Sequence, residues 1–269
     1  MVCCSCLTVA AGDNDLGKLL TSQYQDKILY LRHSFTSGSQ DYYPDGQPVD
    51  PAGEGPWSLY GRMVVSKVVI DKNKLRIEGK RAEFRSDGRA CGKGCMPYVE
   101  ADPFQVTIRL HGPLSSANEA DSALARVFAI APEDVLKSVP SYWQEYLAKL
   151  IAPDAKKTDQ APDAATEKVF KMGEPGVTAP KATYQREPEF SELARKQRFQ
   201  GTVGMNIVID KTGRVSRVSI AKPLGLGLDE QSVNMVRTWK FTPATHDGEP
   251  VAIIVWIEVD FHLGPMYRR

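Results

Sequence analysis

The sequence predicts an α+β protein: a strand-rich N-terminal domain closed by helices, a linker, and a C-terminal domain with a small antiparallel sheet and two helices. Apolar residues alternate with period two through much of the first half, the period then becomes helical, and strand and helix patterns return near the C-terminus. The predicted boundaries are 1–26 for an N-terminal segment, 27–151 for the first domain, 152–183 for the linker, 184–263 for the second domain and 264–269 for a tail.

Composition excludes several classes of function. The 269 residues contain 34 Lys plus Arg and 33 Asp plus Glu, so the net charge is +1 and no global field favours nucleic acid. Hydrophobic residues make up 42%, as in ordinary globular proteins. Because no run reaches about 18 apolar residues, no membrane span is predicted in this chain.

The N-terminus and the cysteines point to export. Val9-Ala10-Ala11 fits the small-residue cleavage pattern of a secretory signal, so residues 1–26 are either the remnant of a longer signal peptide or a frayed, non-targeting end. In an exported protein, Cys91 and Cys95 are a disulfide candidate across three intervening residues. A redox pair and half of a metal site are the alternatives. We expect no metal and no cofactor.

The first domain contains the clearest strands. Phe104 to Leu110 alternates strictly, and residues 27–35, 57–70 and 75–84 also have strand patterns, with a hairpin turn at 71–74. Three helices are expected next. Ser116 and Glu119 form a capping box, Pro132 opens a second helix, and an apolar stripe from Trp143 marks the third.

The second domain follows an Ala-, Pro- and Lys-rich linker. A short helix is expected over 190–198, and a hairpin is expected with strands that start at Gly201 and Val215. The next helix is expected to have Asp229 as its N-cap and to end at Pro243. A last strand is expected over 251–263. The last strand exceeds the usual five or six residues, so part of its backbone is expected to lack an intramolecular partner.

The C-terminal residues resemble a known family. Glu187-Pro188-Glu189-Phe190, Gly201-Thr202-Val203, Trp239-Lys240-Phe241-Thr242-Pro243 and Asp247-Gly248-Glu249-Pro250 occur in the order and spacing of the TonB C-terminal domain. The first domain resembles the extra N-terminal region of some secreted TonB-domain proteins. The resemblance implies a periplasmic protein whose C-terminal domain holds the N-terminal box peptide of an outer-membrane TonB-dependent receptor as an added strand.

The resemblance and the strand pattern also suggest partner-binding residues. Ile254, Trp256 and Glu258 lie on the outward face of the last strand, where solvent exposure or domain packing is the alternative role. Family members often carry Gln-Pro-x-Tyr-Pro ahead of the first helix to hold the receptor peptide. Glu187, Pro188 and Phe190 take the Gln, Pro and Tyr places here, and Pro188 with Phe190 could instead staple the helix start.

Two functions are therefore expected to compete. The first is a periplasmic TonB-like protein that binds a receptor or another envelope partner by strand addition, in association with TonB-dependent transport. The alternative is a periplasmic scaffold that dimerises through the C-terminal domain and binds its ligand through the N-terminal domain. We expect no enzyme, because His33, His111, His246 and His262 lie in no recognisable catalytic motif.

Overall fold

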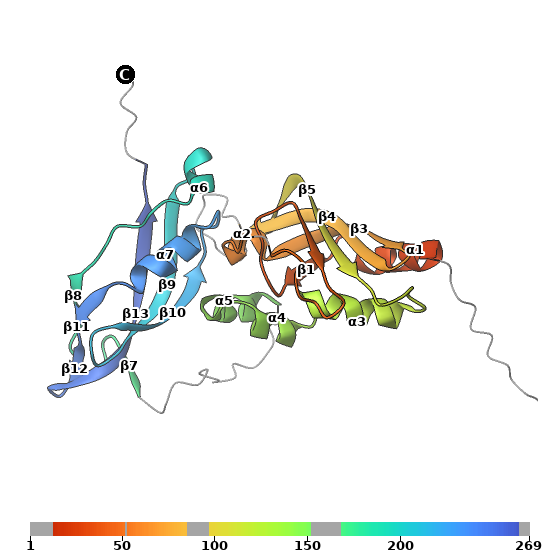
Figure 1. Cartoon of the computed structure of the whole chain (residues 1–269). Coiled ribbons are helices and arrows are strands. Elements are labelled where there is room, and N and C mark those ends of the chain that lie inside the picture. The colour runs from red at the N-terminus through yellow and green to blue at the C-terminus, as the bar shows by residue number, and fades with distance from the viewer. Residues whose placement is uncertain (1–12, 52, 85–96, 152–167, 264–269) are drawn as a thin grey trace, which may run out of the picture. The chain divides into compact units, whose positions relative to one another are not determined.

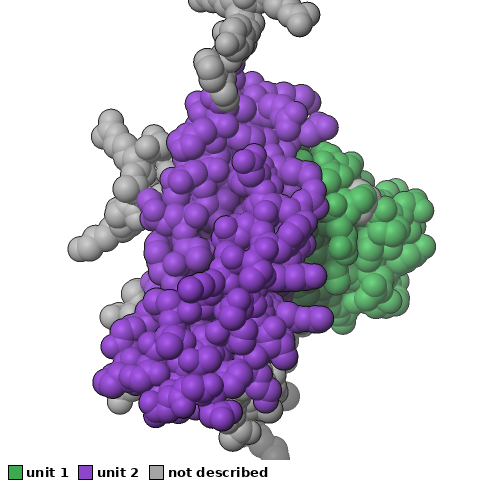
Figure 2. Space-filling model, turned by 90° about the vertical axis from the view of Figure 1, so that its left-hand side faces the viewer, with its two compact units in different colours: residues 1–56, 60–82, 99–135 green, residues 57–59, 83–98, 136–269 purple. Residues whose placement is uncertain are grey.

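A computed structural model describes residues 13–51, 53–84, 97–151 and 168–263. The chain forms two compact units that interleave in sequence (Figure 2). Unit 1 takes residues 1–56, 60–82 and 99–135, and unit 2 takes residues 57–59, 83–98 and 136–269. These units do not follow the predicted domains, because residues 57–59 and the last helix of the first half group with the C-terminal sheet. The α+β class is confirmed.

Unit 1 is built on a six-stranded sheet with the order β2-β5-β4-β3-β1-β6 (Figure 1). Its strands are β1 (Ile28–Leu31), β2 (Ser39–Tyr42), β3 (Arg62–Asp71), β4 (Lys74–Phe84), β5 (Pro97–Arg109) and β6 (Phe128–Ala129). The β3–β4 hairpin turns between Asp71 and Lys74 as predicted, and Lys72 takes φ +50° there. The alternating Phe104, Val106 and Ile108 side chains are all buried, as their period requires.

Three helices of the predicted first domain follow their sequence signals. They are α3 (Ala117–Val127), α4 (Pro132–Ser138) and α5 (Ser141–Ile151). Ser116 caps α3 by accepting a hydrogen bond from the backbone N–H of Glu119. The Glu119 carboxylate accepts hydrogen bonds from the N–H and hydroxyl of Ser115, so the reciprocal half of the capping box is shifted by one residue.

The structure adds a helix near the N-terminus and replaces the start of one predicted strand. Part of the supposed N-terminal segment is helix α1 (Asp13–Tyr24), whose Leu16, Leu20 and Tyr24 are buried at a helical spacing of four. The predicted strand over 57–70 begins with the short helix α2 (Trp57–Tyr60), and the strand proper starts at Arg62. Tyr60 N–H donates to the carbonyl of Pro56 at 3.0 Å, which closes one helical turn.

Unit 2 contains the C-terminal sheet, with the order β10-β9-β13-β12 and with β7 also paired to β13. A separate two-stranded ladder joins β8 to β11. The strands are β7 (Val169–Lys171), β8 (Lys181–Tyr184), β9 (Gly201–Ile209), β10 (Val215–Lys222), β11 (Lys240–Thr242), β12 (Ala244–His246) and β13 (Glu249–Phe261). The predicted hairpin β9–β10 and the long last strand are confirmed. The predicted linker, in contrast, contains β7 and most of β8.

Helices α6 (Glu192–Lys196) and α7 (Leu228–Val236) complete unit 2, and α7 packs against β9 and β10 (Figure 1). The N-cap of α7 is Gly227 in the left-handed conformation, so the prediction of Asp229 as the cap was wrong. The helix also ends at Val236, well before Pro243, because Lys240 to Thr242 pair with β8 as a strand.

Several sequence predictions fall outside the described residues. They include the cleavage pattern at 9–11, the disulfide candidate Cys91 and Cys95, and the linker over 152–167. Within the part of the chain that the structure describes, every helix is too short or too polar to cross a bilayer.

Candidate functional site

The long strand β13 has partners on both sides along only part of its length. On one side it pairs antiparallel with β9 from Ile253 to Phe261. On the other side its first residues pair with β12, up to Val251, and the next three, 252–254, pair in parallel with β7. Among the described residues, no strand pairs with the outer side of β13 from Val255 to Phe261. We call this seven-residue stretch the open edge.

The opposite side of the sheet is protected. Helix α5 packs along β10, the strand at that side, and buries Trp143 and Leu147 completely. The Glu145 carboxylate of α5 accepts a hydrogen bond from the Ser219 hydroxyl of β10 at 2.6 Å. A helix laid along a terminal strand is one of the ways in which proteins keep unpaired backbone from pairing with other chains. The open edge of β13 has no such cover within the described residues.

Side chains along the open edge alternate between two environments. On the inward face Val255 and Ile257 are half-buried, whereas Val259 and Phe261 are buried. Apolar side chains are therefore partly uncovered where the edge begins. An added strand would cover them while its backbone pairs with β13.

Of the three residues predicted on the outward face, two lie on the open edge. Trp256 is 50% exposed and Glu258 is exposed, so both flank the open edge. Ile254 lies at the position paired with Lys171 of β7, so its stretch of β13 is already occupied. Gly204 of β9 makes room for the Trp256 ring, because a Cβ at that position would lie 2.6 Å from the ring.

The segment from Glu187 to Phe190 lies near the far end of the open edge. The Phe190 ring packs edge-on against Phe261, with 5.4 Å between ring centroids. Glu187 is exposed and Pro188 is half-buried. Ser191 accepts the N–H of Ala194 at 3.1 Å and caps α6. Phe190 thus anchors the start of the helix in the core, while Glu187 stays accessible beside it.

Sequence reasoning missed two buried carboxylates at the start of α7. Asp229 is completely buried and accepts the backbone N–H groups of Leu224 and Gly225, both at 2.8 Å. Glu230 is also buried and accepts hydrogen bonds from Ser58 N–H (2.9 Å), Ser58 Oγ (2.6 Å) and Trp143 Nε1 (3.2 Å). Adjacent acidic residues after a glycine-rich loop were the available signal, but local sequence does not reveal that residue 58 binds residue 230.

Burial and charge repulsion shift the pKa of Asp229. Complete burial, and then the nearby Glu230 carboxylate, raise the pKa of Asp229 to about 7, while the two backbone N–H donors oppose the shift. Asp229 and Glu230 hold a loop and two helices in place through fully buried hydrogen bonds. These roles are structural, because both carboxylates are enclosed within unit 2.

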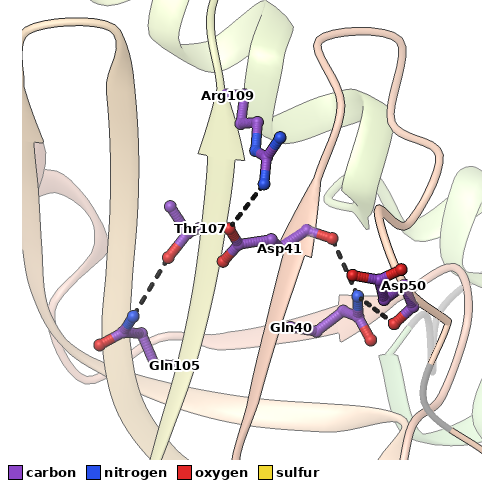
Figure 3. A network of polar contacts seen from close by, with 6 residues as sticks. All are labelled: Gln40, Asp41, Asp50, Gln105, Thr107 and Arg109. Carbon is purple, nitrogen blue, oxygen red and sulfur yellow. Dashed lines mark hydrogen bonds and ion pairs between the residues drawn. The ribbon is translucent and has the colours of Figure 1, made fainter.

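Unit 1 contains a separate polar network, centred on the parallel pair β2–β5 (Figure 3). Arg109 and Asp41 form an ion pair at 3.5 Å across the two strands, and the Gln105 amide donates to Thr107 Oγ1 at 3.1 Å. The Gln40 amide donates to the carbonyl groups of Asp41 and Asp50. These contacts join neighbouring strands and a loop. No group of three or more His, Cys, Asp or Glu residues suited to a metal ion occurs among the described residues.

Comparisons with known proteins concern the C-terminal part of the chain. The family model "Gram-negative bacterial TonB protein C-terminal" matches residues 186–263. "Protein TonB" of Vibrio cholerae serotype O1 is 32% identical over 80 residues, which span 29% of this chain and 33% of that protein. The chain thus matches about a third of the length of this relative.

A solved structure is also similar. The solution NMR structure of the Pseudomonas aeruginosa TonB CTD has 16% sequence identity and a TM-score of 0.28, and the overlap covers 37% of this chain and 95% of that one. The family match begins just after β8 and ends just after β13, so it includes the open edge and the segment from Glu187 to Phe190. Residues 186–263 of this chain are a TonB C-terminal domain.

Proposed function

We propose that this chain is a periplasmic TonB-like protein that binds the N-terminal box peptide of an outer-membrane TonB-dependent receptor as a strand added to the open edge of β13. The observation that carries the proposal is the open edge itself. On the side opposite β9 its backbone has no strand partner among the described residues, and half-buried Val255 and Ile257 offer apolar surface beside it. The family match supports a role in TonB-dependent envelope transport.

Main-chain hydrogen bonds would supply much of the affinity, and neighbouring side chains would select the partner. We assign this second role to Trp256 and Glu258 on the outward face and to Glu187, Pro188 and Phe190 at the far end. Ile254 belongs to the same face but lies beside β7, so it contacts only a partner that extends beyond the open edge. Glu187 stands at the position where family members often have Gln. An ionised Glu side chain has only hydrogen-bond acceptors, so it favours a donor group on the peptide.

Backbone methylation of the peptide tests strand addition. Synthetic box peptides from receptors of the source bacterium are titrated into the ¹⁵N-labelled full chain, and the backbone amides of β13 are followed by NMR. N-methyl groups are then placed at successive residues of a peptide that binds. Only alternate N–H groups of an added strand point at β13, so we expect affinity to fall at every second position.

A uniform effect of methylation along the peptide would contradict strand addition, as would shifts confined to other surfaces. A second copy of the chain could also occupy the open edge, as a dimeric scaffold would require. Sedimentation of the peptide-free chain distinguishes this case, because dimerisation through the edge would increase with protein concentration and would compete with the peptide.

A further inference from the structure

The edge of β13 that we propose for a partner is already partly occupied by the chain itself. Residues 168–178, which we call the strap, lie outside the residues matched by the TonB family model. Their strand β7 pairs in parallel with Ala252, Ile253 and Ile254, on the side of β13 opposite β9. The pairing of β7 stops at Ile254, where the open edge begins, so the two stretches together make up ten consecutive residues of β13, 252–261.

One aromatic side chain anchors the strap. Phe170 is 7% exposed and stacks on the His246 ring, with 4.6 Å between centroids and 28° between planes. The Lys168 ammonium lies 4.2 Å from the centroid of the Phe170 ring. The neighbouring Met172, in contrast, is 52% exposed. Phe170 is therefore the main apolar contact of β7.

Polar contacts hold the second half of the strap against β12. Thr178 N–H donates to the carbonyl of Thr245 at 2.8 Å, and Thr245 N–H donates to Thr178 Oγ1 at 3.0 Å. Gly176 takes φ +75°, and a Cβ there would lie 2.6 Å from a carboxylate oxygen of Asp247. The chain thus places glycine where the strap passes close to the β12–β13 turn.

We infer that the strap is an internal competitor for the partner-binding edge: β7 pairs with β13 until a longer partner strand displaces it. This inference rests on the proposed function. Three residues of β7 provide few ladder hydrogen bonds, and one aromatic side chain supplies most of the apolar contact. A peptide limited to the open edge binds without moving β7, whereas a peptide that pairs from 252 to 261 must first release the strap.

While β7 stays paired with β13, a long peptide cannot bind along its full length. The apparent affinity for such a peptide is therefore reduced, because only the fraction of chains with β7 detached can bind it fully. Weakening the anchor should remove this reduction. The test compares a seven-residue and a ten-residue version of one receptor box peptide, titrated into the full chain. The variants are Phe170→Ala, Thr178→Val as a second way to loosen the strap, and Met172→Ala as the matched control.

We expect Phe170→Ala to bind the ten-residue peptide about tenfold more tightly than the wild type, and Thr178→Val to shift it in the same direction. Affinity for the seven-residue peptide should stay the same in all variants, and Met172→Ala should match the wild type with both peptides. Amide hydrogen exchange at residues 252–254 should become faster in Phe170→Ala and should stay at the wild-type rate in Met172→Ala.

Other outcomes distinguish a failure of this inference from a failure of the proposed function. If both peptides bind every variant with unchanged affinity, the strap does not compete and only this inference fails. A similar gain with both peptide lengths would show general loosening of the sheet and would also overturn it. If neither peptide binds any variant, the proposed receptor binding fails, and the role of the strap fails with it.

Discussion

Asp229 shows how one buried side chain can make stability depend on pH. Its position in the first turn of α7 is expected to favour a charged carboxylate, yet complete burial beside Glu230 raises the pKa from 3.8 to about 7. The two backbone N–H donors from Leu224 and Gly225 explain why an acidic residue is present in this interior at all.

The shift predicts a loss of stability as pH rises. Between about pH 4 and pH 7 folded Asp229 holds a proton that the unfolded chain has released, so its contribution to the free energy of unfolding falls with rising pH, by at most about 1.4 kcal/mol per pH unit. The difference in the free energy of unfolding by urea between the wild type and Asp229→Asn should therefore change between about pH 4 and pH 7. All four tryptophans lie in unit 2, so their fluorescence follows this unit. A pH-independent difference would contradict the assignment.

At the scale of elements, Glu230 connects α7 to α5 and to the Trp57–Ser58 turn. Each of these segments is short, and α2 has only four residues, so their local conformations depend on contacts with distant residues. The Trp57 and Trp143 rings also pack together, with 5.7 Å between centroids. The sequence pattern predicted α5 correctly, but it assigned residues 57–60 to a strand because the buried acceptor for Ser58 lies 172 residues away.

Removal of this acceptor should destabilise unit 2. Glu230→Ala leaves three donors, from Ser58 and Trp143, without their carboxylate, and we expect a loss of about 2–4 kcal/mol in the free energy of unfolding. Tryptophan fluorescence in urea measures the change. Glu192→Ala is the matched control, because Glu192 is an exposed acidic residue in the first turn of α6. Equal effects of the two substitutions would refute the role of Glu230.

At the scale of the whole molecule, the chain protects one side of its C-terminal sheet with α5, a helix of the predicted first domain. This predicts different behaviour for two fragments, 136–269 and 168–269. The shorter one lacks α5, which uncovers β10 and loses the burial of Trp143 and Leu147, worth about 3–6 kcal/mol. We expect the shorter fragment to melt at lower temperature and to self-associate, as measured by calorimetry and sedimentation. Identical behaviour would show that α5 does not protect β10.

Much of this organisation could be predicted from local patterns. Period-two alternation identified β5 and β13, a capping box identified α3, and motifs spread over the C-terminal residues indicated the TonB domain. Helix α1 was missed although Leu16, Leu20 and Tyr24 recur at helical spacing, because the segment was interpreted as a signal remnant. Strand β7 is too short for any period to show, so the segment was assigned to a linker.

The sequence by itself determined the α+β class, most strands and helices, and the family of the C-terminal domain, because these depend on residues close together in the chain or on motifs spread in a fixed order. Only the tertiary structure decided which edge of the C-terminal sheet stays open and over which residues. That depends on β7, which pairs with residues more than 80 positions away, and on α5, which packs beside β10 from a similar distance. Backbone pairing between such distant segments is set by packing of the whole unit, which no local pattern records.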